Sequence, residues 1–233
     1  MVLKDKSFFI TGGSGTLGRE LQEVLTERNL PFKAPSSREC DILDKDRLES
    51  FINNFEEVVH CAAATNVREI EKNPNNAYKT NVIGTINVIE VCKKLNKKLI
   101  FISTDYVFDG NKGNYSINDL INPLSKYAKT KAAAELLVRT YDNSLVIRTS
   151  FFGHYFPYEK AFTDQWSSKD YVDIIAPKIV DTIMLNELGI AHVGSRRRSI
   201  FEIASERNEL VKPAERIEVN ILIPRDTSLN CKK

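Results

Sequence analysis

The strongest indication of the fold class lies near the N-terminus, in the segment Ser7-Phe8-Phe9-Ile10-Thr11-Gly12-Gly13-Ser14-Gly15-Thr16-Leu17-Gly18. A short apolar run ends at clustered glycines, and an amphipathic pattern over 16–28 follows. The glycines satisfy two spacings at once, GxGxxG from Gly13 and GxxGxxG from Gly12. Such glycines permit a tight turn and a close approach of a pyrophosphate, while the amides of the helix N-terminus receive its negative charge. This placement between strand and helix predicts dinucleotide binding rather than a merely tight turn.

Beyond this segment, the first 150 residues alternate short β-rich runs with longer helical patterns, which is typical of a parallel sheet covered on both faces. The rhythm ends after Arg148, where aromatic residues crowd the chain and a capping box, Ser199 to Glu202, starts a short helix. We therefore predict an α/β, Rossmann-type doubly wound parallel sheet. Residues 1–150 would form the NAD(P)-binding domain and residues 151–233 a small, shortened substrate cap, partly interleaved with it. Strands are expected at 7–11, 31–34, 57–61, 98–103 and 144–148, helices at 16–28, 45–54, 74–95, 125–141 and about 173–188, and a last apolar run at 219–223.

Composition and charge narrow the classes of partner. The 233 residues are 42% hydrophobic and 27% charged, which excludes collagen-like and disordered chains. With 33 basic and 31 acidic residues, the net charge of +2 gives no general drive toward nucleic acid or a membrane. The four cysteines lack a CxxC spacing and the three histidines lack metal-ligand spacing, so we expect neither disulfide nor metal. Without a signal-peptide pattern or an apolar run of 18 residues, the expected location is the cytoplasm.

The end of the second predicted strand bears on the choice of cofactor. NAD-preferring versions of this fold carry a carboxylate about 20 residues after the glycines, on the ribose 2′-hydroxyl. Residues 34–38, Ala-Pro-Ser-Ser-Arg, contain none, and their hydroxyls and guanidinium can donate to a 2′-phosphate. NADP(H) is favoured, NAD(H) is the alternative, and a plain polar loop is the competing interpretation. The expected cofactor-binding residues are Gly12, Gly13, Ser14, Gly15, Thr16, Leu17, Gly18, Ser36, Ser37, Arg38, Asp41, Ile42, Ala62, Ala63, Ala64, Tyr127 and Lys131.

A candidate catalytic group combines one strand end with one helix. Tyr127 and Lys131 lie four residues apart on a predicted helix, so their side chains share a face. A nearby ammonium would lower the pKa of the phenol from its reference value of about 10 and suit it to acid–base work. Thr104 follows the fourth strand, at the edge where parallel sheets bind ligands, and could hold a carbonyl oxygen. A solvated helix face would explain the Tyr–Lys pair alone, but Thr104 makes a catalytic trio the better interpretation.

These motifs together resemble the extended short-chain dehydrogenase/reductases, and among them the sugar-nucleotide reductases that act on dTDP-4-dehydrorhamnose. The resemblance implies NADPH-dependent reduction of the 4-keto group of a nucleotide-linked 6-deoxy sugar, with dTDP-4-dehydro-L-rhamnose giving dTDP-L-rhamnose as the expected case. Thr104, Tyr127 and Lys131 match the family's catalytic residues. The matching segments are TGGSGTLG from Thr11, CAAATNV from Cys61, STDYVFDG from Ser103, PLSKYAKTK from Pro123, RTS from Arg148, GSRRRSIFEIA from Gly194 and PRDTSLN from Pro224.

The same resemblance implies the contacts to the substrate. Phe151 stands where the family usually has Trp, and Ala64 stands where a His is common. Arg197, in a run of three arginines, could bind the substrate diphosphate or lie in a solvated loop. A reductase or epimerase of a UDP- or GDP-linked keto sugar, and a non-catalytic NADP-binding regulatory protein, remain as alternatives; a homodimer is also an expectation. The expected substrate-binding residues are Val67, Asn81, Thr104, Asp105, Phe151 and Arg197.

Overall fold

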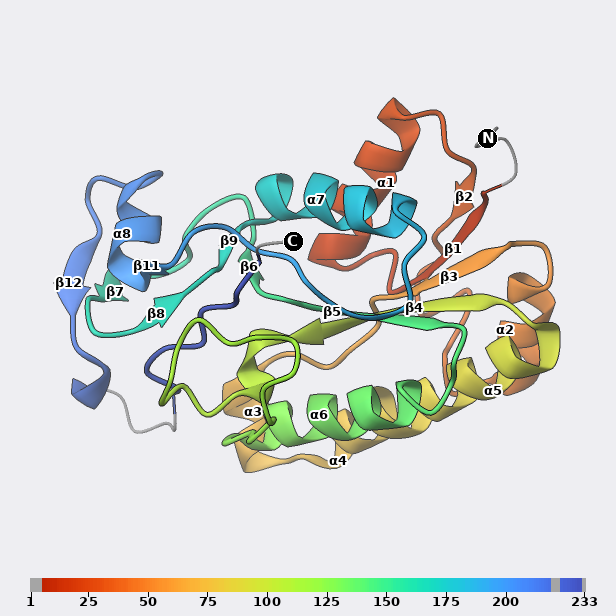
Figure 1. Ribbon diagram of the computed structural model, residues 1–233, viewed down its shortest axis with the longest axis horizontal. Helices are drawn as coiled ribbons and strands as arrows, with labels where there is room; N and C mark the ends of the chain where they lie inside the picture. The colour runs from red at the N-terminus through yellow and green to blue at the C-terminus, as the bar shows by residue number, and fades with distance from the viewer. Residues whose placement is uncertain (1–5, 219–222, 232–233) are drawn as a thin grey trace.

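A six-stranded parallel sheet organises the computed structural model, which describes residues 6–218 and 223–231 (Figure 1). Its order, β10-β5-β4-β3-β1-β2, places the first strand inside the sheet, next to the edge strand β2, and a topological switch between β1 and β3. The first five strands confirm the predicted positions. The sixth, β10, was not predicted, because it has only four residues and none of them is fully buried. The strands are β1 Phe8–Thr11, β2 Phe32–Lys33, β3 Glu57–His60, β4 Lys98–Thr104, β5 Ser144–Thr149 and β10 Gly189–His192.

Helices cover both faces of the sheet, as the alternating pattern predicts (Figure 1). On one face α1 packs against α7, and Leu17, Leu21 and Leu25 of the amphipathic pattern over 16–28 lie in the core between the helices and the sheet. On the other face α2, α5 and α6 bury a second core against β3 and β4. Both faces are therefore dry, and ligands can approach only at the strand ends. The helices are α1 Thr16–Glu27, α2 Lys45–Ile52, α5 Thr85–Leu95, α6 Lys126–Val138 and α7 Val172–Met184.

The predicted helix over 74–95 is more complex than its pattern indicates. It begins as α4, Asn75–Ala77, continues as a π-helical stretch η1, Tyr78–Gly84, and ends as α5. Asn73 does accept a hydrogen bond from the Asn75 amide at 3.2 Å, although Pro74 is the residue that directly precedes the helix. A further helix, α3 Val67–Lys72, lies where none was predicted. Its side-chain cap, Asn66, is the signal that would have located it.

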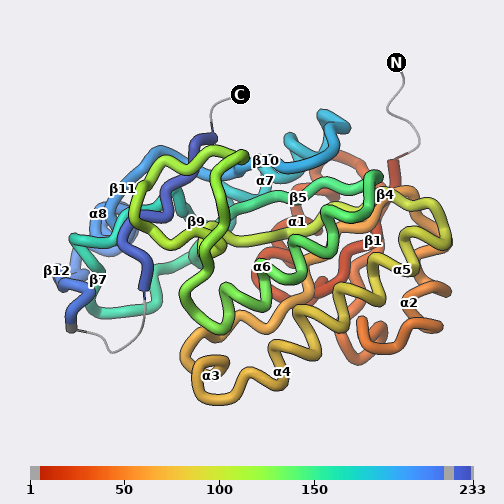
Figure 2. Tube along the Cα trace, turned by 60° about the horizontal axis from the view of Figure 1, so that its bottom comes forward, coloured from red at the N-terminus to blue at the C-terminus, as the bar shows by residue number. Residues whose placement is uncertain are grey.

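The cap is built from short strand pairs and one small helix, at the left of Figure 1. Residues after 150 also return to the main sheet, because α7 packs on α1 and β10 pairs with β5. The C-terminal segment then runs back beside the loop after β4, where Leu229 bridges Tyr115 (Figure 2). Residues 219–222 of the predicted apolar run lie outside the described residues. The cap elements are β6 Phe151–Phe152, β7 Lys160–Phe162, β8 Trp166–Ser167, β9 Asp170–Tyr171, β11 Arg198–Ser199, α8 Ile200–Ser205, β12 Lys212–Ala214 and the 3-10 turn η3 Arg216–Glu218; a further 3-10 turn, η2 Asp105–Val107, follows β4.

Three expected absences concern bonds, metals and membranes. All four cysteines are free thiols. Within residues 6–218 and 223–231, no group of three or more His, Cys, Asp or Glu side chains is arranged to hold a metal ion. Across the same residues, no helix combines the length and the apolar character needed to span a bilayer.

Candidate active site

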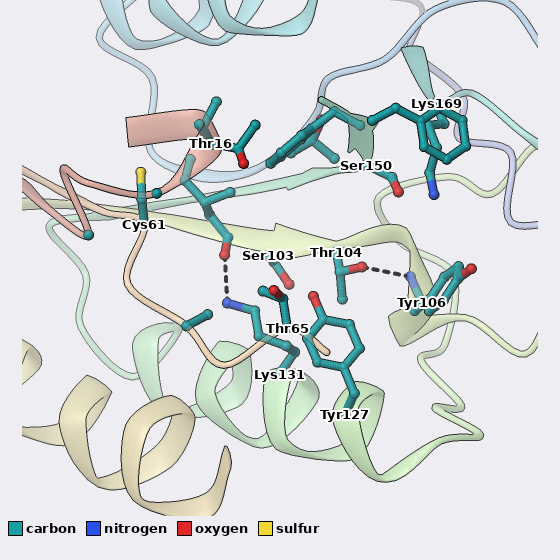
Figure 3. Close-up of a pocket in the computed structure, with 18 of the residues that line it drawn as sticks. Thr16, Cys61, Thr65, Ser103, Thr104, Tyr106, Tyr127, Lys131, Ser150 and Lys169 are labelled. Atoms are coloured by element: carbon teal, nitrogen blue, oxygen red, sulfur yellow. Dashed lines mark hydrogen bonds between the residues drawn. The ribbon is translucent and has the colours of Figure 1, made fainter. Parts of the chain in front are cut away.

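A cleft of about 450 Å³ opens at the carboxyl ends of the central strands, between the sheet and the cap. The glycine loop and the start of α1 form one wall, and Thr104, Tyr127 and Lys131 form the floor (Figure 3). Phe151 and Lys169 belong to the cap side. The cleft thus lies where the strand order reverses, the usual ligand position in open parallel sheets.

The glycine loop is shaped by close backbone contacts. Gly12 has φ of +72°, and a Cβ there would lie 2.8 Å from the Ala62 backbone. A Cβ on Gly18 would lie 2.3 Å from the Gly12 carbonyl oxygen, so helix and loop pack with no room for a methyl group. Gly15 caps α1 without a side-chain hydrogen bond and lines the cleft. The first amides of α1 are therefore available to an anion, and this cradle fits the pyrophosphate of a dinucleotide.

Tyr127 and Lys131 reach the cleft because α6 begins where the sequence predicts. The Ser125 hydroxyl accepts a hydrogen bond from the Ala128 amide at 3.1 Å and starts the helix. One turn later, the Lys131 ammonium donates to the Ile102 carbonyl oxygen at 2.8 Å and lies 4.1 Å from the centre of the Phe101 ring. Figure 3 shows the Tyr127 phenol beside Thr104, at the end of β4. The predicted trio therefore meets at one place.

Burial shifts the pKa values of Tyr127 and Lys131, the two titratable members of this trio. It lowers the pKa of Lys131 to about 8 and raises the pKa of Tyr127 well above its ordinary value. The Thr104 hydroxyl opposes that rise by hydrogen bonding to the phenol, but its effect is smaller. The expectation that Lys131 lowers the phenol pKa is wrong for this state of the protein, since the ammonium is turned to Ile102 instead. Near pH 7 Tyr127 is therefore a neutral phenol, whereas Lys131 remains mostly protonated.

Asn81 and Asp105, two predicted substrate contacts, instead form buried hydrogen bonds that connect parts of the protein. Asn81 is 1% exposed, and its amide bonds to both backbone groups of Ala64 and to the Thr130 hydroxyl. Asp105, also 1% exposed, accepts hydrogen bonds from Ser167 at 3.0 Å and Thr227 at 2.7 Å. Neither side chain lines the cleft. Asp105 joins the end of β4 to the cap and the C-terminal segment, a role that depends on contacts distant in sequence.

The predicted 2′-phosphate region lies at the end of β2. Arg38 and Ser37 are exposed, whereas Ser36 is partly covered. Both the amide and the hydroxyl of Ser36 donate to the Glu39 carboxylate at 2.8 Å, and these bonds lower the pKa of Glu39. The Glu39 carboxylate therefore lies beside residues 34–38, which themselves contain no carboxylate. Asp41 caps its own turn by accepting from the Leu43 amide, and Ile42 is buried against α5, so neither faces the cleft.

Arg197 does not reach the cleft either. Its guanidinium bonds to Asp226 at 2.7 Å and lies 4.0 Å from the centre of the Trp166 ring. The neighbouring Arg198 is buried in ion pairs with Asp170 and Glu206. The arginine run fastens the cap together, which corrects its assignment to the substrate. Val67 and Phe151, in contrast, line the cleft.

Some of the predicted cofactor-binding residues line the cleft and others do not. Five loop residues and Ala63 line the cleft, whereas Gly13, Ser14, Ala62 and Ala64 do not; the five are Gly12, Gly15, Thr16, Leu17 and Gly18. Several cleft residues were missed. Tyr106 and Ser150 lie within the STDYVFDG and RTS segments and could have been inferred from them. Lys169 and Tyr158 carried no sequence signal, because the chain brings them to the cleft only through the fold of the cap.

Comparisons with known proteins agree with this geometry. The chain is 36% identical over 177 residues to dTDP-4-dehydrorhamnose reductase of Aggregatibacter actinomycetemcomitans, a match covering 73% of this chain and 60% of that protein. It is 32% identical over 145 residues to methionine adenosyltransferase 2 subunit beta of Bos taurus, covering 58% of this chain and 43% of that protein. The matches thus span about half the length of these curated relatives.

The structure resembles the crystal structure of dTDP-4-dehydrorhamnose reductase from Bacillus anthracis in complex with NADP. The TM-score is 0.87 at 26% identity, and the alignment covers 99% of this chain and 91% of that one. The predicted Rossmann-type fold and the family resemblance are confirmed. The family model described as RmlD substrate binding domain matches residues 6–177, and the chain therefore belongs to the RmlD substrate binding domain family.

Proposed function

We propose that this protein is an NADP(H)-dependent reductase of a keto group on a nucleotide-linked 6-deoxy sugar. The convergence of Thr104, Tyr127 and Lys131 beside the glycine loop carries the proposal. The names of the Aggregatibacter and Bacillus relatives make dTDP-4-dehydro-L-rhamnose the first substrate to test. UDP- and GDP-linked keto sugars are the alternatives within the same chemistry.

The residues divide the work of reduction. NADP(H) held at the glycine loop would supply the hydride. The Thr104 hydroxyl would donate a hydrogen bond to the carbonyl oxygen, where negative charge develops. Tyr127 then transfers its phenolic proton to that oxygen and leaves the product as an alcohol. The Lys131 ammonium, which in this structure donates to the Ile102 carbonyl oxygen, would turn toward the resulting phenolate and stabilise the charge that burial disfavours.

The test is NADPH oxidation with dTDP-4-dehydro-L-rhamnose, followed by absorbance. We expect turnover by the wild type and a loss of about 10²- to 10⁴-fold in Tyr127→Phe, the usual scale of acid–base catalysis. NADPH binding, measured by fluorescence, should persist in that variant. Tyr155→Phe is the matched control, because Tyr155 is 81% exposed. Undiminished turnover in Tyr127→Phe would refute the assigned mechanism.

A non-catalytic regulatory role is the second candidate. The similarity to a protein named as a subunit of methionine adenosyltransferase supports it. The retained trio argues against it, since a protein that only binds NADP(H) needs no proton donor in the cleft. Tight NADPH binding together with no reduction of dTDP-, UDP- or GDP-linked keto sugars would favour this role over the reductase.

A further inference from the structure

Lys169 is held at the wall of the cleft by the cap. It sits between β8 and β9, and its amide donates to the Ser167 hydroxyl at 3.0 Å. That hydroxyl in turn donates to the buried Asp105 at the end of β4. The position of Lys169 is therefore tied to the strand that ends in Thr104, although the two are 65 positions apart in sequence.

The ammonium of Lys169 lacks the partner that other cap cations have. Four cap arginines form ion pairs with carboxylates; these are Arg197, Arg198, Arg207 and Arg216. Among the described residues, no carboxylate lies within ion-pair distance of Lys169. Its neighbours are the rings of Phe152, 4.5 Å from the ammonium to the ring centre, and Tyr106, at 5.7 Å.

The surroundings leave this charge unsatisfied. Burial lowers the pKa of Lys169, and the charge of Asp105 counteracts that only in part. Both oxygens of Asp105 accept hydrogen bonds from hydroxyl groups, on Thr104, Ser167 and Thr227. An anion entering the cleft would therefore find a cation that is desolvated, fixed in place and not neutralised, which is the setting of a strong charge-assisted hydrogen bond.

Figure 3 shows the Lys169 ammonium and the Ser150 hydroxyl pointing into the same space, on the side opposite Tyr127 and facing Thr104. The glycine loop, which would take the cofactor pyrophosphate, forms a different wall. A neutral 6-deoxy keto sugar carries its negative charge on the diphosphate that links it to the nucleoside. The diphosphate is thus the anion that such a substrate would bring into the cleft lined by Lys169.

We propose that Lys169 binds the diphosphate of the nucleotide-linked sugar and so selects diphosphate-linked over free sugars. This inference rests on the proposed function for the identity of the sugar, but binding of a nucleoside diphosphate tests it separately. Lys169 would then have the diphosphate-binding role that the sequence suggested for Arg197. The Arg197 guanidinium is instead paired with Asp226.

The first experiment is calorimetry with dTDP, UDP and thymidine on wild type, Lys169→Met and Lys169→Arg. We expect Lys169→Met to raise the Kd for a nucleoside diphosphate by about tenfold to a hundredfold, the scale of one charged hydrogen bond. Thymidine and NADPH binding should not change, and Lys169→Arg should recover part of the affinity. Lys212→Met, an exposed cap lysine, is the control and should behave as wild type.

The second experiment separates this inference from the proposed function. If the wild type reduces the keto sugar, Lys169→Met should raise KM while kcat at saturation stays within a few-fold. An unchanged KM and an unchanged Kd for dTDP and UDP would overturn the role of Lys169. If the wild type reduces nothing yet binds dTDP or UDP through Lys169, the diphosphate site stands and the reductase falls. Absence of nucleoside diphosphate binding in the wild type would overturn the site.

Discussion

The Glu135 carboxylate and the Arg148 guanidinium form an ion pair, 2.6 Å between Oε1 and Nη2, with side chains 0% and 1% exposed. The Ser103 hydroxyl donates to the same carboxylate at 2.6 Å. Glu135 follows Lys131 by four residues, as Lys131 follows Tyr127, so the three side chains share one face of α6. The buried pair therefore fastens the helix that carries the proposed catalytic groups to β4 and β5.

Removing one member of this pair should be costly. Glu135→Gln leaves the Arg148 charge buried without a counter-charge, and we expect a loss of about 3–5 kcal/mol in the free energy of unfolding. Urea denaturation measures it, with Glu90→Gln as the control, since Glu90 forms an exposed ion pair with Lys45. Equal stability of the two variants would show that the buried pair does not hold α6 in place.

Two glycines of the loop should separate folding from cofactor binding. Gly18→Ala places a Cβ 2.3 Å from the Gly12 carbonyl oxygen and should destabilise the fold by about 1–3 kcal/mol. Gly15→Ala meets only that oxygen, at 3.2 Å, but adds a methyl group at the cleft surface. We expect Gly15→Ala to melt close to the wild type and bind NADPH at least about tenfold more weakly. Tight NADPH binding by folded Gly15→Ala would place the pyrophosphate elsewhere.

Glu39 should set the preference between the two nicotinamide cofactors. Its carboxylate, held on Ser36, would repel a 2′-phosphate bound by Ser36, Ser37 and Arg38. Glu39→Gln should raise kcat/KM for NADPH several-fold relative to NADH, and less so at high salt. The exposed Glu23 on α1 supplies the control, Glu23→Gln. A cofactor ratio that stays constant in Glu39→Gln would mean that the carboxylate is turned away when the cofactor binds.

Lys131 should make stability depend on alkaline pH. Its pKa in the folded protein is about 8, below the value of about 10.4 expected in an unfolded chain. Between these values the unfolded state binds more protons, so the free energy of unfolding should rise with pH through this window, by up to ~3 kcal/mol. Below pH 8 both states are protonated and this dependence vanishes. The rise should be smaller in Lys131→Met in urea denaturation at pH 7 to 10, where only groups such as Lys169 would still contribute to it; an equal rise in both proteins would assign it wholly to other groups.

Local signals in the sequence were sufficient for the first five strands of the main sheet and for part of the proposed site, but not for β10. The strand, glycine loop and helix from Ser7 onward form a contiguous unit, and the Tyr127–Lys131 spacing follows from helix geometry alone. Thr104 could also be predicted from a local signal, because residues at the carboxyl ends of parallel strands lie at the edge of the sheet where ligands bind. The division of the chain at residue 150 stays a prediction.

The remainder depended on tertiary contacts. No pattern near Arg197 reveals that Asp226 neutralises it, and none near Asp105 reveals the hydroxyl groups of Ser167 and Thr227. Residue type alone suits these side chains to bind ligands, but partners distant in sequence have taken up their hydrogen-bonding capacity.

Sequence patterns were enough to predict the Rossmann-type fold, the glycine loop and the proposed trio of Thr104, Tyr127 and Lys131, because each depends on local features: strand ends, a tight turn and helix spacing. Only the tertiary structure decided which charges remain available to a ligand. Arg197 and Asp105 are paired by the fold, whereas Lys169, which no sequence pattern marked, has no carboxylate partner among residues 6–218 and 223–231. The physical reason is that a charge's availability depends on burial and on neighbours brought together from the whole chain.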